Sequence, residues 1–317
     1  MSVELVEVVR SGFRECVHRG SVAATRPDGE PALVLGETHT PIYPRSTNKP
    51  LQAVALLRNG YVPASTAELA IITSSHSGEA DHIELVEGLL ARYGLTETQL
   101  RCPDEHPRDD FARAELLASG ELPRPLYMPC SGAHAAMLAV CAVNDWPLDS
   151  YLEPAHPLQE AIVGTVAAVS GEADPELGID GCGQPIVPLS LTHLAHIYRS
   201  LVAAEPGSPE GIVADAMREH PYLVSGTGRS EARLMPAVPG LLCKSGADGV
   251  YAGALADGSA FAVKIDDGHE RALLPIAAAL AHHLGAEWTE DLASLASLPV
   301  LGGGARVGTI RAIPGIF

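Results

Sequence analysis

Strand-like segments at both ends of the chain enclose a helix-rich middle, and this order constrains the fold more than any other feature. Residues 16–37, "CVHRGSVAATRPDGEPALVLGE", predict two strands around a Pro-Asp-Gly turn, and "VELVEVV" (3–9) alternates in the same way. Residues 249–268, "GVYAGALADGSAFAVKIDDG", predict a second hairpin around Ala-Asp-Gly. A last strand is expected near the C-terminus.

Apolar periodicity predicts helices between these hairpins and one more after them. The helices are expected over residues 47–58, 80–94, 109–120, 131–146, 156–170, 192–204, 209–219 and 271–285. The run "ELAIITSS" (68–75) fits a strand or a short buried helix end. The terminal strands can pair into one antiparallel sheet beside a helical layer, which predicts an α+β fold. We expect one domain over 1–317, with its sheet from about 1–40 and 240–317 and its helices over about 47–220.

The bulk composition excludes several classes of protein. With 317 residues, 46% of them hydrophobic, the chain is long enough for a large core. It has no apolar run of about 18 residues that would predict a membrane span, and its start does not resemble a signal peptide. A net charge of −18 argues against nucleic acid or an anionic membrane as a partner. Six scattered cysteines predict reduced thiols and a cytoplasmic protein.

Lysine is rare in this chain, which makes each lysine a candidate for chemistry. Of the 21 lysine and arginine residues, only Lys49, Lys244 and Lys264 are lysines. Arginine does not release its proton in a protein, whereas a buried lysine can. Unless these three remain by chance, they mark places where arginine would not work.

The stretch "YPRSTNKPLQAVALL" places Ser46 three residues before Lys49. If both lie in the first turn of a helix they share one face, and a neutral lysine amine can then accept the serine proton. The alternative is a solvated helix start with Ser46 or Thr47 as its cap, and the S-x-x-K pattern alone does not decide. Pro50 disfavours a helical conformation at Lys49 and predicts an irregular turn.

Two further motifs are candidates for the same catalytic site. "TSSHSGE" gathers three serines and a histidine at an expected loop, and fits a serine amidase element or a polar turn that caps a helix. "CKSG" resembles the Lys-Thr-Gly strand of the serine penicillin-recognising enzymes. Its Gly246 would let a substrate carbonyl approach backbone amides. Lys264 follows on the next predicted strand, in "AVKIDDG", while the role of Lys244 stays open.

A separate set of residues offers metal ligands. The segments "PCSGAH" and "IDGCG" contribute Cys130, Asp180 and Cys182, two thiols and a carboxylate of the kind that zinc accepts. His134 is a candidate fourth ligand. The alternative is a set of buried free thiols, which is common for cysteine. No Walker or dinucleotide fingerprint occurs, so no organic cofactor is expected.

Seven motifs follow one another over residues 44–268. They are "PRSTNKPLQ", "SSHSGE", "PCSGAH", "IDGCGQP", "SGTGRSEARLM", "CKSGADGVYAGAL" and "AVKIDDG". In this order they resemble the L-asparaginase II family, the Rhizobium-type or class 3 asparaginases. The resemblance implies a fold similar to serine β-lactamases and glutaminases, hydrolysis of L-asparagine to L-aspartate and ammonia, and a homodimer.

The resemblance also implies which residues act. It makes Ser46 with Lys49 the first catalytic pair and Ser75 with Lys264 the second, with Ser77 as the alternative to Ser75. Three more residues are expected to contact the substrate, namely Arg45, His76 and Gly246.

Family members hold zinc through two cysteines, an aspartate and a lysine, and the resemblance matches Cys130, Asp180 and Cys182 to three of these ligands. Ala133 stands where the family has its lysine. Three outcomes are therefore open: zinc with a water in the lysine's place, weak binding, or no zinc. Two other functions also stay open. A glutaminase or β-lactam-type amidase would use the same serine and lysines, whereas a non-catalytic amino-acid-binding relative would keep only the pocket, and Ala133 favours the latter.

Overall fold

The computed structural model describes residues 1–170 and 176–317. Within that part of the chain, no helix is both long and apolar enough to cross a membrane. The chain divides into two compact units. We call them the sheet unit (Met1–Thr47, Leu189–Ala203 and Arg233–Phe317) and the helical unit (Asn48–Pro188 and Ala204–Ala232). The single domain expected from the sequence stays a prediction.

The sheet unit is built on an antiparallel sheet whose strands come from both ends of the chain. Its strands are β1 (Val3–Arg10), β2 (Phe13–Thr25), β3 (Pro31–Leu35), β6 (Leu242–Gly246), β7 (Val250–Ala254), β8 (Ala260–Ile265), β9 (Ser297–Gly302) and β10 (Ala305–Ala312). Their order is β6-β7-β8-β2-β1-β10-β9, with β3 also paired to β2. The pairings β1–β10 and β2–β8 join the two ends of the chain, which confirms the α+β fold predicted from the sequence.

The predicted turns explain the two hairpins that frame the sheet. Gly258 adopts a left-handed backbone (φ 93°) between β7 and β8, and the Asp257 carboxylate accepts a hydrogen bond from the Ser259 amide. Gly29 has the same φ of 93° between β2 and β3. Only glycine adopts such a backbone without strain, so both turns sit where the sequence predicts them.

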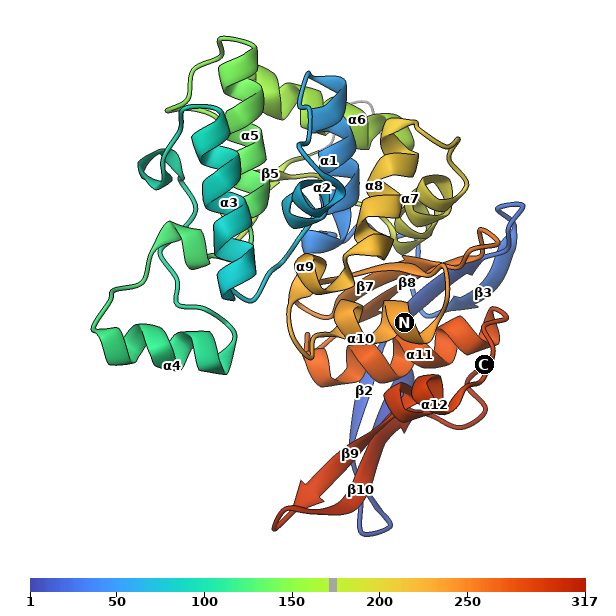
Figure 1. Cartoon of the computed structure of the whole chain (residues 1–317). Coiled ribbons are helices and arrows are strands. Elements are labelled where there is room, and N and C mark those ends of the chain that lie inside the picture. The colour runs from blue at the N-terminus through green and yellow to red at the C-terminus, as the bar shows by residue number, and fades with distance from the viewer. Residues whose placement is uncertain (171–175) are drawn as a thin grey trace. The chain divides into compact units, whose positions relative to one another are not determined.

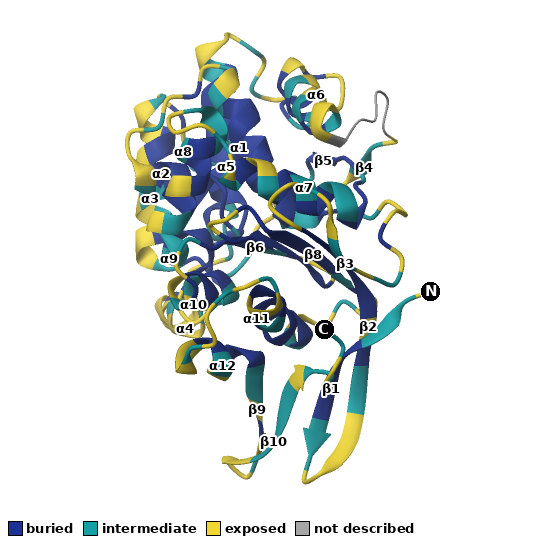
Figure 2. Ribbon diagram, turned by 90° about the vertical axis from the view of Figure 1, so that its right-hand side faces the viewer, coloured by how far each residue is buried: buried dark blue, intermediate teal, exposed yellow. Residues whose placement is uncertain are grey.

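Two helices cover the sheet on opposite faces. The helix α7 (Leu191–Val202) contacts β2, β7 and β8, and α11 (Leu273–His283) contacts β7, β8 and β10. Figure 2 shows these helices on either side of the central strands, with the strands between them coloured as buried. The sequence places α7 within the helical middle, but its buried apolar side packs on the sheet.

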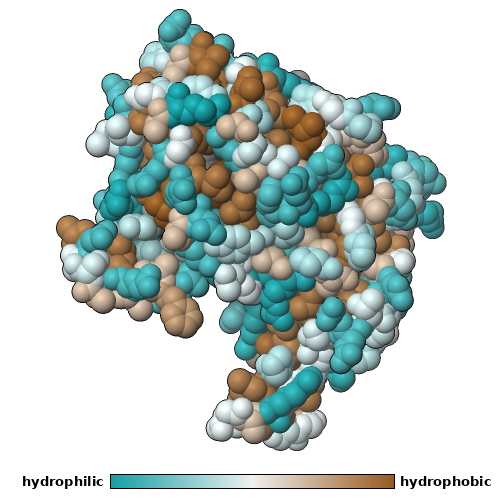
Figure 3. Space-filling model, in the orientation of Figure 1, coloured by the Kyte–Doolittle hydropathy of each residue, from teal (hydrophilic) through white to brown (hydrophobic). Residues whose placement is uncertain are grey.

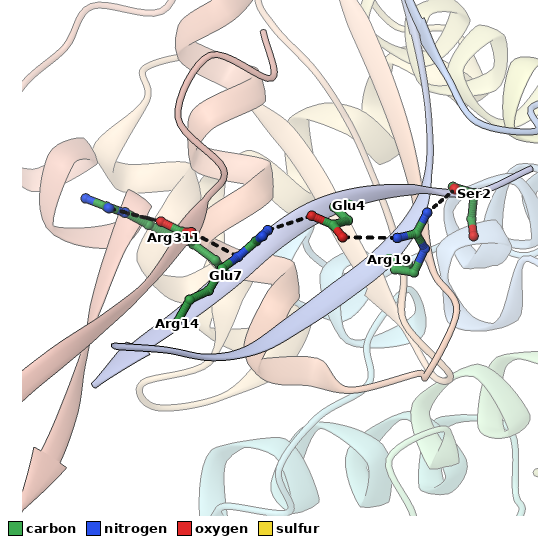
Figure 4. A network of polar contacts seen from close by, with 6 residues as sticks. All are labelled: Ser2, Glu4, Glu7, Arg14, Arg19 and Arg311. Carbon is green, nitrogen blue, oxygen red and sulfur yellow. Dashed lines mark hydrogen bonds and ion pairs between the residues drawn. The ribbon is translucent and has the colours of Figure 1, made fainter. Parts of the chain in front are cut away.

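An ion-pair network ties β1 to its two neighbours (Figure 4). Glu4 pairs with Arg14 and Arg19 of β2, at 2.7 and 3.2 Å. Glu7 lies between Arg14, at 3.3 Å, and Arg311 of β10, at 3.0 Å. The Glu7 side chain is only 11% exposed, so its two arginine partners compensate a carboxylate that is largely removed from water.

The helical unit packs around one buried helix. Its helices are α1 (Lys49–Arg58), α2 (Thr66–Ile72), α3 (Ala80–Arg92), α4 (Asp110–Ser119), α5 (Ser131–Val143), α6 (Pro157–Ser170), α8 (Pro209–Glu219) and α9 (Pro221–Ser225), and the short strands β4 (Gly178–Ile179) and β5 (Pro185–Ile186) pair beside them. Every residue of α5 from Ser131 to Cys141 is buried, and α5 contacts α1, α2, α3 and α6 (Figure 1). The helix α10 (Ser230–Ala237) contains the last of the boundaries between the two units along the chain.

The helix α4 differs from its neighbours because only Leu116 among its residues is buried. Phe111 is 82% exposed, Leu117 is 57% exposed and the following Leu122 is 77% exposed. Figure 3 shows hydrophobic atoms at the surface in the region where α4 lies. An amphipathic pattern therefore predicted this helix correctly, although most of its apolar side chains stay at the surface.

Candidate active site

The serine expected to be the nucleophile lies in a tight turn of the sheet unit. Ser46 belongs to a 3-10 turn (Arg45–Asn48) that leads directly into α1. The Thr47 hydroxyl donates to the Pro44 carbonyl at 2.6 Å, and the Tyr198 hydroxyl donates to the Thr47 carbonyl at 2.8 Å. Lys49 begins α1 and Pro50 occupies its first turn, where proline is well tolerated. Lys49 is therefore helical, contrary to the bias expected from Pro50, and the irregular 3-10 turn lies before it.

Gly246 packs closely against this turn. A Cβ added at Gly246 would lie 2.9 Å from the Pro44 carbonyl oxygen and 3.2 Å from a Thr47 methyl carbon. The close approach expected at Gly246 is therefore made by the chain's own turn, which only glycine accommodates. Its expected contact with substrate stays a prediction.

Two of the three lysines lie on the strands of the sheet unit. Lys264 on β8 is half-buried, and its ammonium donates to the Ile265 carbonyl. Partial burial lowers the pKa of Lys264 below its usual value. Lys244 on β6 is fully buried and donates to the Ser245 carbonyl at 2.8 Å.

The third lysine is the centre of a polar cluster in the helical unit. Lys49 is 1% exposed, and its side chain donates to the Ser74 carbonyl and, at 3.3 Å, to the Ser75 hydroxyl. It also makes a hydrogen bond with Cys130. A lysine this deeply buried is restrained in position by its partners, and it brings Ser75 into the neighbourhood of α1. The pairing of Ser75 with Lys264, implied by the family resemblance, stays a prediction.

The structure distinguishes Ser75 from Ser77. The Ser77 hydroxyl donates to Glu79 at 2.5 Å, and a Cβ at Gly226 would lie 1.9 Å from that hydroxyl. Ser77 is therefore held within the fold, whereas the Ser75 hydroxyl faces Lys49. These contacts favour Ser75 as the second serine.

Glu79 links the loop of residues 73–79 to the loop at Gly226, and this contact was not predicted from the sequence. Besides the Ser77 hydroxyl, Glu79 accepts hydrogen bonds from the Thr227 amide at 2.9 Å and the Thr227 hydroxyl at 2.6 Å. Burial alone would raise the pKa of Glu79, but the hydrogen bonds from Ser77 and Thr227 outweigh it and lower that pKa. The glycines of "SSHSGE" and "SGTGRSE" could have indicated this contact, since a close approach of two backbone segments requires such residues.

His76 belongs to the same loop, and its side chain is fully buried. It lies stacked on His82 with ring centroids 5.3 Å apart, and its Nε2 lies 2.8 Å from the Ser131 hydroxyl. The Gly78 amide donates to His76 Nδ1 at 3.1 Å. Burial holds the pKa of His76 well below its usual value, so the ring is neutral. Both ring nitrogens are thus engaged inside the protein, which favours support of the loop over the substrate contact that we expected.

The two candidate metal-binding cysteines contact each other. A hydrogen bond with the Cys182 thiol, followed by the influence of Lys49, lowers the pKa of Cys130 to about 6. The same hydrogen bond raises the pKa of Cys182 far above its usual value. Asp180 accepts a hydrogen bond from the Gly181 amide at 2.7 Å. All six cysteines are free thiols.

The residues of this cluster do not fit a zinc site as they are arranged. Across residues 1–170 and 176–317, no three His, Cys, Asp or Glu side chains come together in a way that could hold a metal ion. His134 lies fully buried with its Nδ1 2.7 Å from the Tyr151 hydroxyl, and burial lowers its pKa to about 3. Zinc binding by Cys130, Asp180 and Cys182 stays a prediction.

The expected site residues are therefore distributed over both units. The sheet unit contains Arg45, Ser46, Gly246 and Lys264, and the helical unit contains Lys49, Ser75, His76, Cys130, Asp180 and Cys182. Within the sheet unit the turn of Ser46 contacts Gly246, and within the helical unit Lys49 contacts Ser75 and Cys130. In the sequence, Ser46 precedes the buried Lys49, and the Ser75 hydroxyl accepts a hydrogen bond from that lysine.

Comparison with known proteins identifies the family of the chain. The sequence profile of the family described as L-asparaginase II matches residues 6–312. The chain therefore belongs to the L-asparaginase II family, and at the level of the family it is an asparagine-hydrolysing amidase. This confirms the resemblance found in the ordered motifs.

Structural comparison adds two distant similarities. A β-lactamase from Mycobacterium bovis is 15% identical with a TM-score of 0.44, over 84% of this chain and 94% of that one. EstCE1, a hydrolase with promiscuous acyltransferase activity, is 13% identical with a TM-score of 0.35, over 84% of this chain and 89% of that one. No curated protein sequence matches the chain.

Proposed function

We propose that this protein hydrolyses the side-chain amide of L-asparagine to give L-aspartate and ammonia, with Ser46 as the nucleophile. The observation that carries the proposal is the buried Lys49, which directly follows the Ser46 turn and donates to Ser75. Membership of the L-asparaginase II family supports the choice of substrate.

In the proposed first half-reaction, Ser46 Oγ attacks the side-chain amide carbon of asparagine. The neutral amine of Lys49 accepts the serine proton as the new C–O bond forms. Lys49 then returns that proton to the amide nitrogen, the C–N bond breaks, and ammonia leaves. An aspartyl ester of Ser46 remains.

In the second half-reaction, water attacks the ester carbonyl and releases aspartate. Lys49 again accepts a proton, this time from water, and Ser46 recovers its hydrogen when the ester bond breaks. We assign Ser75 and Lys264 to the proton relay. The contact between Ser75 and Lys49 supports this role for Ser75, and partial burial lowers the pKa of Lys264.

A second candidate function is a binding protein that recognises an amino acid without turnover. Ala133 favours it, because alanine at this position removes a side chain that the family uses beside the site. A third is a glutaminase or β-lactam-type amidase, which would use the same serine and lysines.

One set of measurements separates the three. We expect ammonia release from asparagine to exceed release from glutamine, with no cleavage of a chromogenic β-lactam. A thermal shift caused by asparagine without any ammonia release would instead establish the binding protein. Faster turnover of glutamine or of the β-lactam would contradict the choice of asparagine.

Two further proposals follow from the family and the composition. We propose a cytoplasmic protein that acts on a free small molecule, with no nucleic acid or membrane partner. We also propose a homodimer. Light scattering coupled to size-exclusion chromatography tests it, and a mass near the 33.1 kDa of one chain would contradict it.

A further inference from the structure

Two residues of the sheet unit share an unusual backbone conformation and also bind each other. Among the described residues, only four that are not glycine have a positive φ, and two of these are Arg45 and Asp248, both at 55°. Their side chains form an ion pair. Aspartate is one of the few side chains that visits this region readily, whereas arginine is not. The strained residue immediately precedes Ser46.

Asp248 lies in a turn that is itself tightly fixed. It sits between β6 and β7, beside Gly249, whose carbonyl accepts a hydrogen bond from the Ile265 amide at 2.8 Å. A Cβ on Gly249 would lie 2.6 Å from the Ile265 carbonyl oxygen. The turn is thus packed against the end of β8, and it presents the Asp248 carboxylate at a defined place.

The end of β6 and the turn that follows it hold the Ser46 turn at two points. Gly246 packs against Pro44 and Thr47, and two residues later Asp248 binds Arg45. Such a backbone conformation persists only where the surroundings hold it, and it commonly marks a functional site.

We propose that Asp248 is a positioning residue for the reaction: by binding Arg45 it maintains the left-handed backbone that orients Ser46. This inference rests on the proposed function, in which Ser46 is the nucleophile. It assigns Arg45 a role through its backbone and its ion pair with Asp248. The substrate contact expected from the sequence is then not its main role.

The ion pair between Arg45 and Asp248 fixes the local backbone more than it stabilises the whole fold. The Asp248 side chain is 69% exposed and that of Arg45 is 24% exposed, and ion pairs open to water contribute little to the stability of a fold. Loss of Asp248 should therefore leave the folded state intact while the turn before Ser46 becomes less defined. Small displacements of a reacting group reduce rates strongly.

The first test compares Asp248→Asn and Asp248→Glu with a matched control, Glu15→Gln. Glu15 forms an exposed ion pair with Arg10 at 3.0 Å in the same unit, far along the chain from Ser46. For Asp248→Asn we expect kcat for asparagine to fall about tenfold with KM within about twofold. The melting temperature should move by no more than about 2 °C, and amide hydrogen exchange should accelerate at residues 44–48. Asp248→Glu keeps the carboxylate but disfavours the positive φ, so its kcat should lie between those of Asp248→Asn and the wild type. Glu15→Gln should change none of these quantities.

The second test uses glycine, which adopts a positive φ without strain. If Arg45 acts through its backbone, Arg45→Gly should retain more kcat than Arg45→Ala, and adding Asp248→Asn to Arg45→Gly should change nothing further. Equal losses in Arg45→Gly and Arg45→Ala would overturn the inference, because they indicate a direct substrate contact. So would an Asp248→Asn protein with normal kcat and normal exchange at residues 44–48.

These tests distinguish the inference from the proposed function. Wild type and Ser46→Ala are measured in the same assay, and a wild type that releases no ammonia contradicts the proposed function. The exchange at residues 44–48 does not depend on turnover. If the wild type is inactive and the exchange at residues 44–48 also fails to respond to Asp248→Asn, the inference is overturned as well.

Discussion

The amine of Lys49 lies 3.3 Å from the hydroxyl of Ser75, and it also donates to the carbonyl of Ser74. The buried Lys49 directly follows the 3-10 turn that contains Ser46, and it thus contacts the loop that contains the second candidate serine. Lys49 is therefore common to the proposed first catalytic pair and to the observed contact with Ser75.

Replacing Lys49 by arginine should abolish turnover. Arginine stays protonated in a protein, so it does not accept a proton under ordinary conditions. We expect Lys49→Arg to lower kcat by at least about 100-fold, measured as ammonia release from asparagine. The far-UV circular dichroism spectrum should match that of the wild type. A Lys49→Arg protein with more than a tenth of the normal rate would rule out Lys49 as the base.

Ser75 and Ser77 should give opposite results when each is changed to alanine. Ser75→Ala removes the hydroxyl on Lys49, so we expect a loss of kcat of about 10-fold or more with a normal melting temperature. Ser77→Ala removes a hydrogen bond to a carboxylate, so we expect a loss of about 1–3 kcal/mol in the free energy of unfolding and a smaller effect on kcat. The reverse pattern would identify Ser77 as the second serine.

Glu79 should make stability depend on pH. Its pKa is lowered in the folded protein, so its contribution is fully present above the pKa of the unfolded chain and is lost as the pH falls through the folded value. The difference in unfolding free energy between wild type and Glu79→Gln should therefore be largest near neutral pH. It should shrink below about pH 4. Urea unfolding at several pH values measures it, with exposed Glu84→Gln on α3 as the control. A difference that grows toward acid pH would contradict this account.

Placing the family's lysine at position 133 tests the prediction that zinc binds beside Cys130. We expect Ala133→Lys to bind zinc more tightly than the wild type, because it supplies the ligand that the family uses beside Cys130 and Cys182. Equilibrium dialysis followed by metal analysis measures the stoichiometry, and Cys182→Ala in the Ala133→Lys background is the control. Equal zinc content in wild type and Ala133→Lys would show that the lysine position does not decide binding.

The sequence predicted the elements of this fold well where periodicity and turn residues agree. The helix α8 has the predicted bounds, and α3 ends as expected before Gly94 with its φ of 68°. Sequence reasoning left the run at 68–75 undecided between a strand and a helix end, because the run is too short to show a period. In the structure its first residues belong to the seven-residue helix α2. The helix α5 stops at Val143, three residues early, because Asp145 adopts a left-handed backbone.

The candidate site was predictable only as a list of residues. The scarcity of lysine and the order of the motifs pointed to Ser46, Lys49 and Ser75. The contact between Lys49 and Cys130 was not predictable, since these residues lie about 80 positions apart and no local pattern encodes their meeting. The same holds for Glu79 with Thr227 and for Arg45 with Asp248. Such contacts depend on how distant loops pack, and a single sequence shows only that glycines stand beside them.

The most direct test of the central claim is the rate of ammonia release from asparagine by wild type and by Ser46→Ala. Ser294 is exposed on the helix α12 (Glu290–Ala296) and provides the control variant Ser294→Ala. We predict that wild type and Ser294→Ala release ammonia at equal rates, and that Ser46→Ala is slower by at least about 1,000-fold with an unchanged melting temperature. A Ser46→Ala protein that releases ammonia at a near-normal rate would contradict the account.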